Sequence, residues 1–230
     1  MCSAQAIVKS VSSDEKDKLD AMICVYESIQ RKDGGLCFFV GDTDGLLDQI
    51  EAHFGLSRLN NQSMDRNSQT MLDCSMNLGK YPVIRLDLRT LYCKNRNAFD
   101  RLLTEAVKRT IHDATDKYGT TWNGNYVTVK CVDMLVGIPH RHYDEDILKT
   151  LAIMMYTNLG SVDNPQTKKM PILLVDGYDH VLNHVENGKD AEYCMKMIGR
   201  LIDSVSQQSL VSSIVITGNH DPCSKYGACS

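Results

Sequence analysis

Short apolar runs alternate along this chain with longer stretches in which apolar residues recur every three or four positions. Runs of the first kind, bounded by glycine, proline or polar residues, are typical of strands covered on both faces in a parallel sheet. Stretches of the second kind predict amphipathic helices. The runs are residues 36–40, 82–88, 172–175 and 214–216, and the expected helices are 12–31, 46–54, 99–118, 144–159 and 191–206. Because strands and helices alternate, the pattern predicts an α/β fold, a three-layer parallel sheet with helices on both faces.

Polar residues predict where some of these elements begin. Ser12, with Glu15 three residues later, has the spacing of a capping box for the first helix. Asp144 is expected to cap the helix that carries Ile147 to Leu159. Residues 57–78 are rich in Asn, Gln, Ser and Asp and are interpreted as a surface excursion. Residues 126–136 fit a strand or a buried helix, and their β-branched content favours a strand.

Composition fits one soluble globular domain over residues 1–230. Hydrophobic residues make up 43% and charged residues 23% of the 230 residues, and no apolar stretch has the length needed to span a bilayer. The net charge of −4 makes nucleic acid an unlikely partner, since phosphate backbones are bound by clustered Lys and Arg. Nine cysteines without a CxxC pair indicate free thiols, hence an intracellular, cytoplasmic location, with the nucleus left open.

Ligands of parallel α/β sheets usually bind beyond the carboxyl ends of the strands. Three of these ends carry polar residues or glycine, at Gly41-Asp42, at Asp176 and at Thr217-Gly218-Asn219. These are the places where a functional site is expected.

The segments Lys80 to Leu88, Leu174 to Asp179 and Ile216 to Gly218, in this order and with a long helix opening at Phe99, resemble the AAA-ATPase-like domain of many prokaryotic proteins. The resemblance covers about residues 37–219 and implies a P-loop NTPase-like core. The chain stops soon after the fourth run, so the C-terminal helical lid of AAA proteins is expected to be missing.

The chain departs from that family at the residues that bind and hydrolyse ATP. In the family, the P-loop is basic and ends in Gly-Lys-Thr or Gly-Lys-Ser, whose lysine binds phosphate and whose hydroxyl binds magnesium. Here Gly45 is followed by Leu46 and Leu47, which are expected to pack in or near the core, and Asp42 and Asp44 replace basic residues. The family's catalytic Glu is replaced by Gly177, which has no acid or base group.

These departures predict a noncatalytic, ATPase-derived domain, a pseudo-ATPase that acts through protein interaction as an adaptor, decoy or assembly factor, with a protein partner or by self-association. The resemblance leaves five vestigial cofactor-binding positions: Gly41, Gly45, Asp176, Thr217 and Asn219. No catalytic residue, metal ligand or resident cofactor is expected, and weak binding of ATP or Mg²⁺ stays open. A regulatory nucleotide-binding module without turnover and an active hydrolase with an unconventional loop are the alternatives.

Three further patterns suggest other chemistry. Gly41-Asp42-Thr43-Asp44 and Gly218-Asn219-His220-Asp221 resemble fragments of the metallophosphoesterase signature, with Asp42, Asn219 and His220 as metal ligands, and a local turn is the competing interpretation. His180 and His184 have the i, i+4 spacing of two metal ligands, and His140 and His142 flank Arg141, although solvated histidines account for all four. Cys223 follows His220 and Asp221, an arrangement that does not favour a cysteine nucleophile.

A sheet that ends with the fourth run would leave one side without its usual neighbour, and an unpaired strand edge invites pairing with another chain. Residues 126–136, a partner that protects Ile214 to Thr217, or the tail from Pro222 to Ser230 are expected to cover this edge.

Overall fold

The computed structural model describes residues 6–31, 35–56, 79–118, 146–158, 169–206 and 210–220. These residues form a sheet of five parallel strands in the order β1-β2-β5-β4-β3. The strands are β1 (Ile7–Val11), β2 (Gly35–Gly41), β3 (Val83–Asp87), β4 (Ile172–Asp176) and β5 (Ser213–Gly218). The helices are α1 (Glu15–Gln30), α2 (Leu46–Phe54), α3 (Arg96–Tyr118), α5 (Ile147–Asn158) and α6 (Gly188–Ser206), with a 3₁₀ helix η5 (His180–Asn183).

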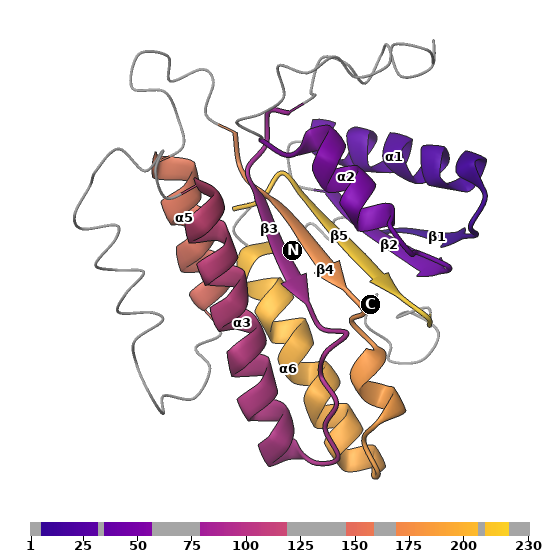
Figure 1. Cartoon of the computed structure of the whole chain (residues 1–230), viewed down its shortest axis with the longest axis vertical. Helices are drawn as coiled ribbons and strands as arrows, with labels where there is room; N and C mark the ends of the chain where they lie inside the picture. Colours follow the sequence, from indigo (N-terminus) through magenta and orange to yellow (C-terminus); the bar gives the residue numbers. More distant parts are fainter. Residues whose placement is uncertain are drawn as a thin grey trace.

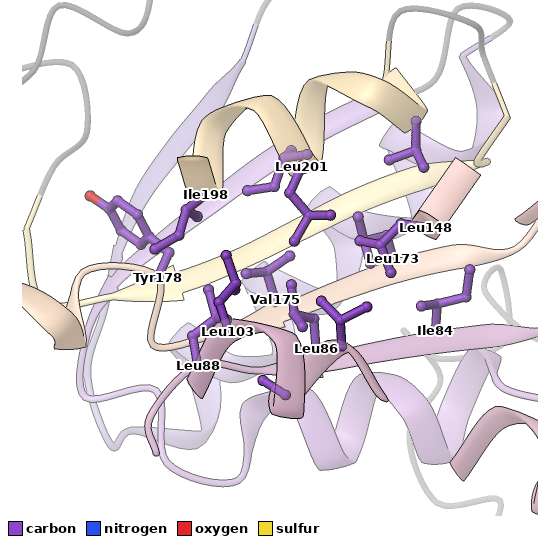
Figure 2. Close-up of a cluster of buried hydrophobic side chains, with 14 of the residues drawn as sticks. Ile84, Leu86, Leu88, Leu103, Leu148, Leu173, Val175, Tyr178, Ile198 and Leu201 are labelled. Carbon is purple, nitrogen blue, oxygen red and sulfur yellow. The ribbon is translucent and has the colours of Figure 1, made fainter. Parts of the chain in front are cut away.

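Helices cover both faces of the sheet, which confirms the predicted α/β architecture (Figure 1). Successive side chains of a strand point to opposite faces. In β2, Cys37 and Phe39 therefore pack with α1 and α2, whereas Phe38 packs in the core beneath α3, α5 and α6. Figure 2 shows the core beneath α3, α5 and α6, where side chains of β3 and β4 contact those of α3 and α6. The side chains of β4 and β5 are buried on both faces of the sheet, as their apolar runs predict.

Helix α1 begins later than the capping-box pattern predicts. The residue before its first turn is Asp14, whose carbonyl accepts a hydrogen bond from the Lys18 amide (3.2 Å). Ser12 instead binds Asp17, which accepts bonds from the Ser12 hydroxyl (2.5 Å) and amide (3.1 Å). The expectation that Ser12 caps the helix with Glu15 is therefore wrong, since Asp17 takes the reciprocal role.

The N-terminal strand β1 was not predicted, and it changes the edges of the sheet. It pairs in parallel with β2 over Ile7 to Val11, so it covers the side of β2 that the sequence left open. Strand β5 pairs with both β2 and β4, so the expectation of an exposed edge at Ile214 to Thr217 is wrong. The other two proposed covers, residues 126–136 and 222–230, lie outside the described residues.

Strand β3 lies at the opposite side of the sheet, and helix α3 satisfies part of its backbone. The Tyr118 hydroxyl accepts a hydrogen bond from the Val83 amide (2.9 Å), and the Thr110 hydroxyl donates to the Arg85 carbonyl (2.9 Å). A parallel edge strand otherwise presents such groups to solvent or to another chain. Side chains of α3 therefore take the place of a sixth strand at these two positions.

None of the helices within the described ranges combines the length and the apolar character needed to cross a membrane.

We expect Tyr118→Phe to lower the free energy of unfolding by about 1–2 kcal/mol, because the buried Val83 amide loses its acceptor. Urea denaturation followed by circular dichroism measures the change. Tyr26→Phe removes the same atom from helix α1 and serves as the control, with an expected change below about 0.5 kcal/mol. Equal losses in the two variants would contradict the bond between α3 and the edge strand.

Candidate functional site

The helices change from one face of the sheet to the other between the first and second halves of the chain. Helices α1 and α2, which follow β1 and β2, cover one face, and α3, α5 and α6, which follow β3 and β4, cover the other (Figure 1). Ligands of open α/β sheets bind at the carboxyl ends of strands beside such a reversal. Here the reversal lies where β2 meets β5, so residues 41–45, 176–179 and 217–220 form the candidate site.

Amides of the loop after β2 donate hydrogen bonds to other groups of the chain. The Asp42 amide donates to the Val11 carbonyl (3.0 Å), the Asp44 amide to the Asp42 carboxylate (3.4 Å), and the Leu46 amide to the Thr43 carbonyl (3.0 Å). Gly41 and Gly45 both have positive φ angles, 115° and 73°, which glycine adopts without strain. Three amides of the loop are thus already bonded, one to strand β1 and two within the loop itself.

Leu46 and Leu47, at the positions that hold Lys and a hydroxyl residue in the resembling family, are buried. Their exposed fractions are 0% and 2%, and both belong to the core between α1, α2 and the sheet. The expectation that they pack into the core is confirmed.

Asp176, at the end of β4, has both carboxylate oxygens engaged by the chain. Oδ1 accepts a hydrogen bond from the Thr217 hydroxyl (3.0 Å). Oδ2 forms ion pairs with Arg85 (3.3 Å) and Arg89 (3.2 Å), and only 11% of the Asp176 side chain is exposed. Thr217 also accepts a hydrogen bond from the Gly177 amide (3.4 Å). The structure therefore brings two predicted site residues, Asp176 and Thr217, into direct contact.

The two arginines extend this contact into a network of charges. Arg85 also pairs with Asp48 and Glu51 of α2, and Lys117 of α3 pairs with Glu51 (2.5 Å). Burial alone would lower the pKa of Arg85, but hydrogen bonds to Asp48 and Asp176 raise it. Bonds to Asp87, and then the nearby Asp176, raise the pKa of Arg89. Both guanidinium groups are therefore permanently charged partners of the acids.

Asp179 forms a second centre next to the first, on the end of β5. Its side chain is 1% exposed and accepts bonds from the amides of Asn219 (3.0 and 3.1 Å) and His220 (2.8 Å) and from His220 Nδ1 (2.6 Å). The Tyr178 hydroxyl donates to the His220 carbonyl (2.5 Å). Asp179 thus fixes the chain after β5, and the Asn219 side chain itself is exposed. Of Asn219, only the backbone takes part in the site.

The metal-dependent interpretations find limited support in this geometry. Of the proposed metal ligands Asp42, Asn219 and His220, His220 already uses its Nδ1 atom to bond to Asp179. The described ranges contain no cluster of three or more His, Cys, Asp or Glu side chains suited to a metal ion. His180 and His184 do face one another, with Nε2 atoms 3.3 Å apart. His140, His142 and Cys223 lie outside the described residues.

Sequence reasoning missed the residues that organise the site, which are Arg85, Arg89 and the carboxylate of Asp179. Arg85 alternates with the buried apolar positions of β3, and this alternation is the signal in the sequence that could have indicated it. No pattern in the sequence indicates that Arg89 reaches back to Asp176, since that contact depends on the turn after β3.

We expect Asp179→Ala to lower the free energy of unfolding by about 3 kcal/mol, because two amides and an imidazole nitrogen lose their shared buried acceptor. Chemical denaturation measures the loss, and hydrogen exchange should show faster exchange of the Asn219 and His220 amides. Asp113→Ala on the exposed side of α3 is the control and should change little. Unchanged exchange of the two amides would contradict the assigned role of Asp179.

Searches of protein-family models, of curated proteins and of solved structures found no match to this chain.

Proposed function

We propose that this chain is a noncatalytic domain derived from a P-loop ATPase and that it acts through protein contacts, as an adaptor, decoy or assembly factor. The observation that carries the proposal is the occupation of Asp176, the counterpart of the family's magnesium-associated Asp, by Thr217, Arg85 and Arg89. A carboxylate that is already neutralised inside the protein offers little to a metal ion.

Magnesium binding would compete with fixed positive charge. Mg²⁺ requires oxygen ligands in a nearly ideal octahedron and is usually held by one or two carboxylates together with substrate phosphates. The Oδ2 atom of Asp176 lies between two guanidinium groups, at 3.2 and 3.3 Å. A divalent cation at this oxygen would face both positive charges, so Mg²⁺ binding requires the arginines to move away.

The position of the missing catalytic acid is filled as well. Gly177 has a φ of 65°, in the left-handed region that disfavours a residue with a side chain. A Cβ atom built there would lie 2.6 Å from the Cγ of Arg89. A glutamate at residue 177 is therefore incompatible with the present position of Arg89, so loss of the acid and gain of the arginine contact belong together.

The loop after β2 supports the same proposal. A phosphate-binding loop presents free amides and a lysine to the anion. Here the Asp42 amide is bonded to β1, the amides of Asp44 and Leu46 are bonded within the loop, and two carboxylates lie in the exposed loop. The scaffold is kept while phosphate binding, metal binding and water activation are each replaced by internal contacts, and a retained scaffold without chemistry favours a binding role.

We expect about 1 mM ATP with excess Mg²⁺ to leave the melting temperature unchanged, because only a ligand that binds the native state raises it. Differential scanning fluorimetry with ATP, ADP and GTP, with and without Mg²⁺ or Mn²⁺, measures this directly. Asp176→Asn is the matched variant. A rise of several degrees in the wild-type chain that disappears in Asp176→Asn would overturn the proposal and favour a nucleotide-binding module. Phosphate release in the same samples would favour a hydrolase.

We expect Gly177→Ala to lower the free energy of unfolding by about 1–3 kcal/mol, because alanine is strained at this φ and its methyl group meets Arg89. Gly199→Ala is the control. It lies within helix α6 with no atom within 4 Å of an added Cβ, so it should stabilise the chain by about 0.5–1 kcal/mol. Urea denaturation compares the two variants, and a neutral Gly177→Ala would argue against the coupling of Gly177 and Arg89.

A further inference from the structure

His180 and His184 form a pair outside the site described above. Both belong to the segment after β4, in which η5 begins, and their Nε2 atoms lie 3.3 Å apart. Their rings are tilted by 53° with centroids 5.0 Å apart, so the two nitrogens approach each other while the rings do not stack. Both side chains are partly exposed, which leaves room for water beside the nitrogens.

The backbone around the pair is held in place by short-range hydrogen bonds. The His180 amide donates to the Gly177 carbonyl (3.0 Å), and the His184 amide donates to the Val181 carbonyl (3.1 Å). Between them, Val181 is 1% exposed and anchors the turn in the core. The spacing of the two histidines is therefore set by a bonded turn with a buried anchor.

Tyr92 holds the two rings from a neighbouring segment. Its ring lies edge-on to His180 (centroids 5.2 Å apart, 90°) and to His184 (4.7 Å, 60°). Leu91 and Cys93 on either side of it are buried, so the 64% exposed Tyr92 is directed outward by its neighbours. The segment after β3, which carries Tyr92, and the segment after β4 run side by side in Figure 1. The Glu186 amide donates a hydrogen bond to the Lys94 carbonyl (3.5 Å) between them.

From this arrangement we infer a binding site for a transition-metal dication such as Zn²⁺, held by His180 Nε2 and His184 Nε2. An ion at the usual Zn–N length of about 2.05 Å from both nitrogens, 3.3 Å apart, makes an N–Zn–N angle of about 107°, close to tetrahedral. Imidazole nitrogen suits zinc, copper and nickel and does not suit magnesium or calcium. Water completes the coordination, because within the described ranges no third His, Cys, Asp or Glu joins the pair.

The bond that the metal displaces is weak. At 3.3 Å, the His180–His184 contact is longer than the usual N–H···N or N–H···O bond, and it requires one ring to donate and the other to accept. A metal ion bonds to both nitrogens at once and requires that neither Nε2 atom carries a proton. The site is independent of the proposed loss of ATPase chemistry, since it shares no residue with Asp176 or its arginines.

The test is a Zn²⁺ titration of the full chain, followed by long-range ¹H–¹⁵N spectra of the seven histidine side chains. This readout reports on imidazole nitrogens and is not confused by zinc on the cysteines. We expect the Nε2 signals of His180 and His184 to shift together and to saturate at the same Zn²⁺ concentration. His184→Asn should weaken binding at His180 by about a hundredfold, because the second ligand no longer acts intramolecularly.

Two further variants keep the result interpretable. His112→Ala on the exposed side of α3 is the control and should leave both titrations unchanged. If His184→Asn does not give the wild-type amide spectrum, the reciprocal His180→Asn is read at His184. The inference is overturned if neither signal shifts at about 1 mM Zn²⁺, if the two saturate at different concentrations, or if His180 titrates identically with and without His184.

Discussion

A carboxylate at the end of a buried strand has to be neutralised. In this chain Arg85, within strand β3, and Arg89, just after it, form ion pairs with Asp176. An unpaired charge at a site that is only 11% exposed would be costly. Because Arg85 also pairs with Asp48 and Glu51, the same compensation fixes helix α2 against the sheet. The position of Arg89 in turn requires a residue without a side chain at 177. Neutralisation of Asp176 by the two arginines therefore also involves the contact of α2 with the sheet and the need for glycine at residue 177.

The second acid of the segment, Asp179, has a different role. It is buried more deeply than Asp176 and accepts hydrogen bonds from two backbone amides and from His220 Nδ1 after β5, so it connects the adjacent ends of β4 and β5. Together the two acids join β3, β4 and β5 at the edge where an enzyme of this architecture would keep open ligand positions. Both carboxylates therefore stabilise the arrangement of these strand ends.

The strands and helices with a strong hydrophobic pattern could be predicted from the sequence, because burial on both faces requires apolar residues at every position of a central strand. Strand β1 could not, since it lies at the side of the sheet and has five residues that are partly buried or exposed up to the buried Val11. The capping role expected of Ser12 and Glu15 failed because Ser12 binds Asp17, five residues later, and the spacing alone does not indicate that partner. The contacts of Arg89 and Asp179 depend on turns that bring residues about 40 or more positions apart together, and no local pattern specifies such turns.

The place of β5 in the sheet has a consequence for how the molecule is assembled. Among the five strands that the structure describes, β5 comes last in the sequence, yet it is the central one, and its two neighbours belong to the earlier pairs β1–β2 and β3–β4. Until residues 213–218 have been synthesised, β2 and β4 lack the strand that pairs with both of them in the folded sheet. Contacts of such long sequence separation are slow to form. The described sheet is thus joined by the last of its strands to be synthesised, and before that step its unpaired strand edges are open to pairing with other molecules.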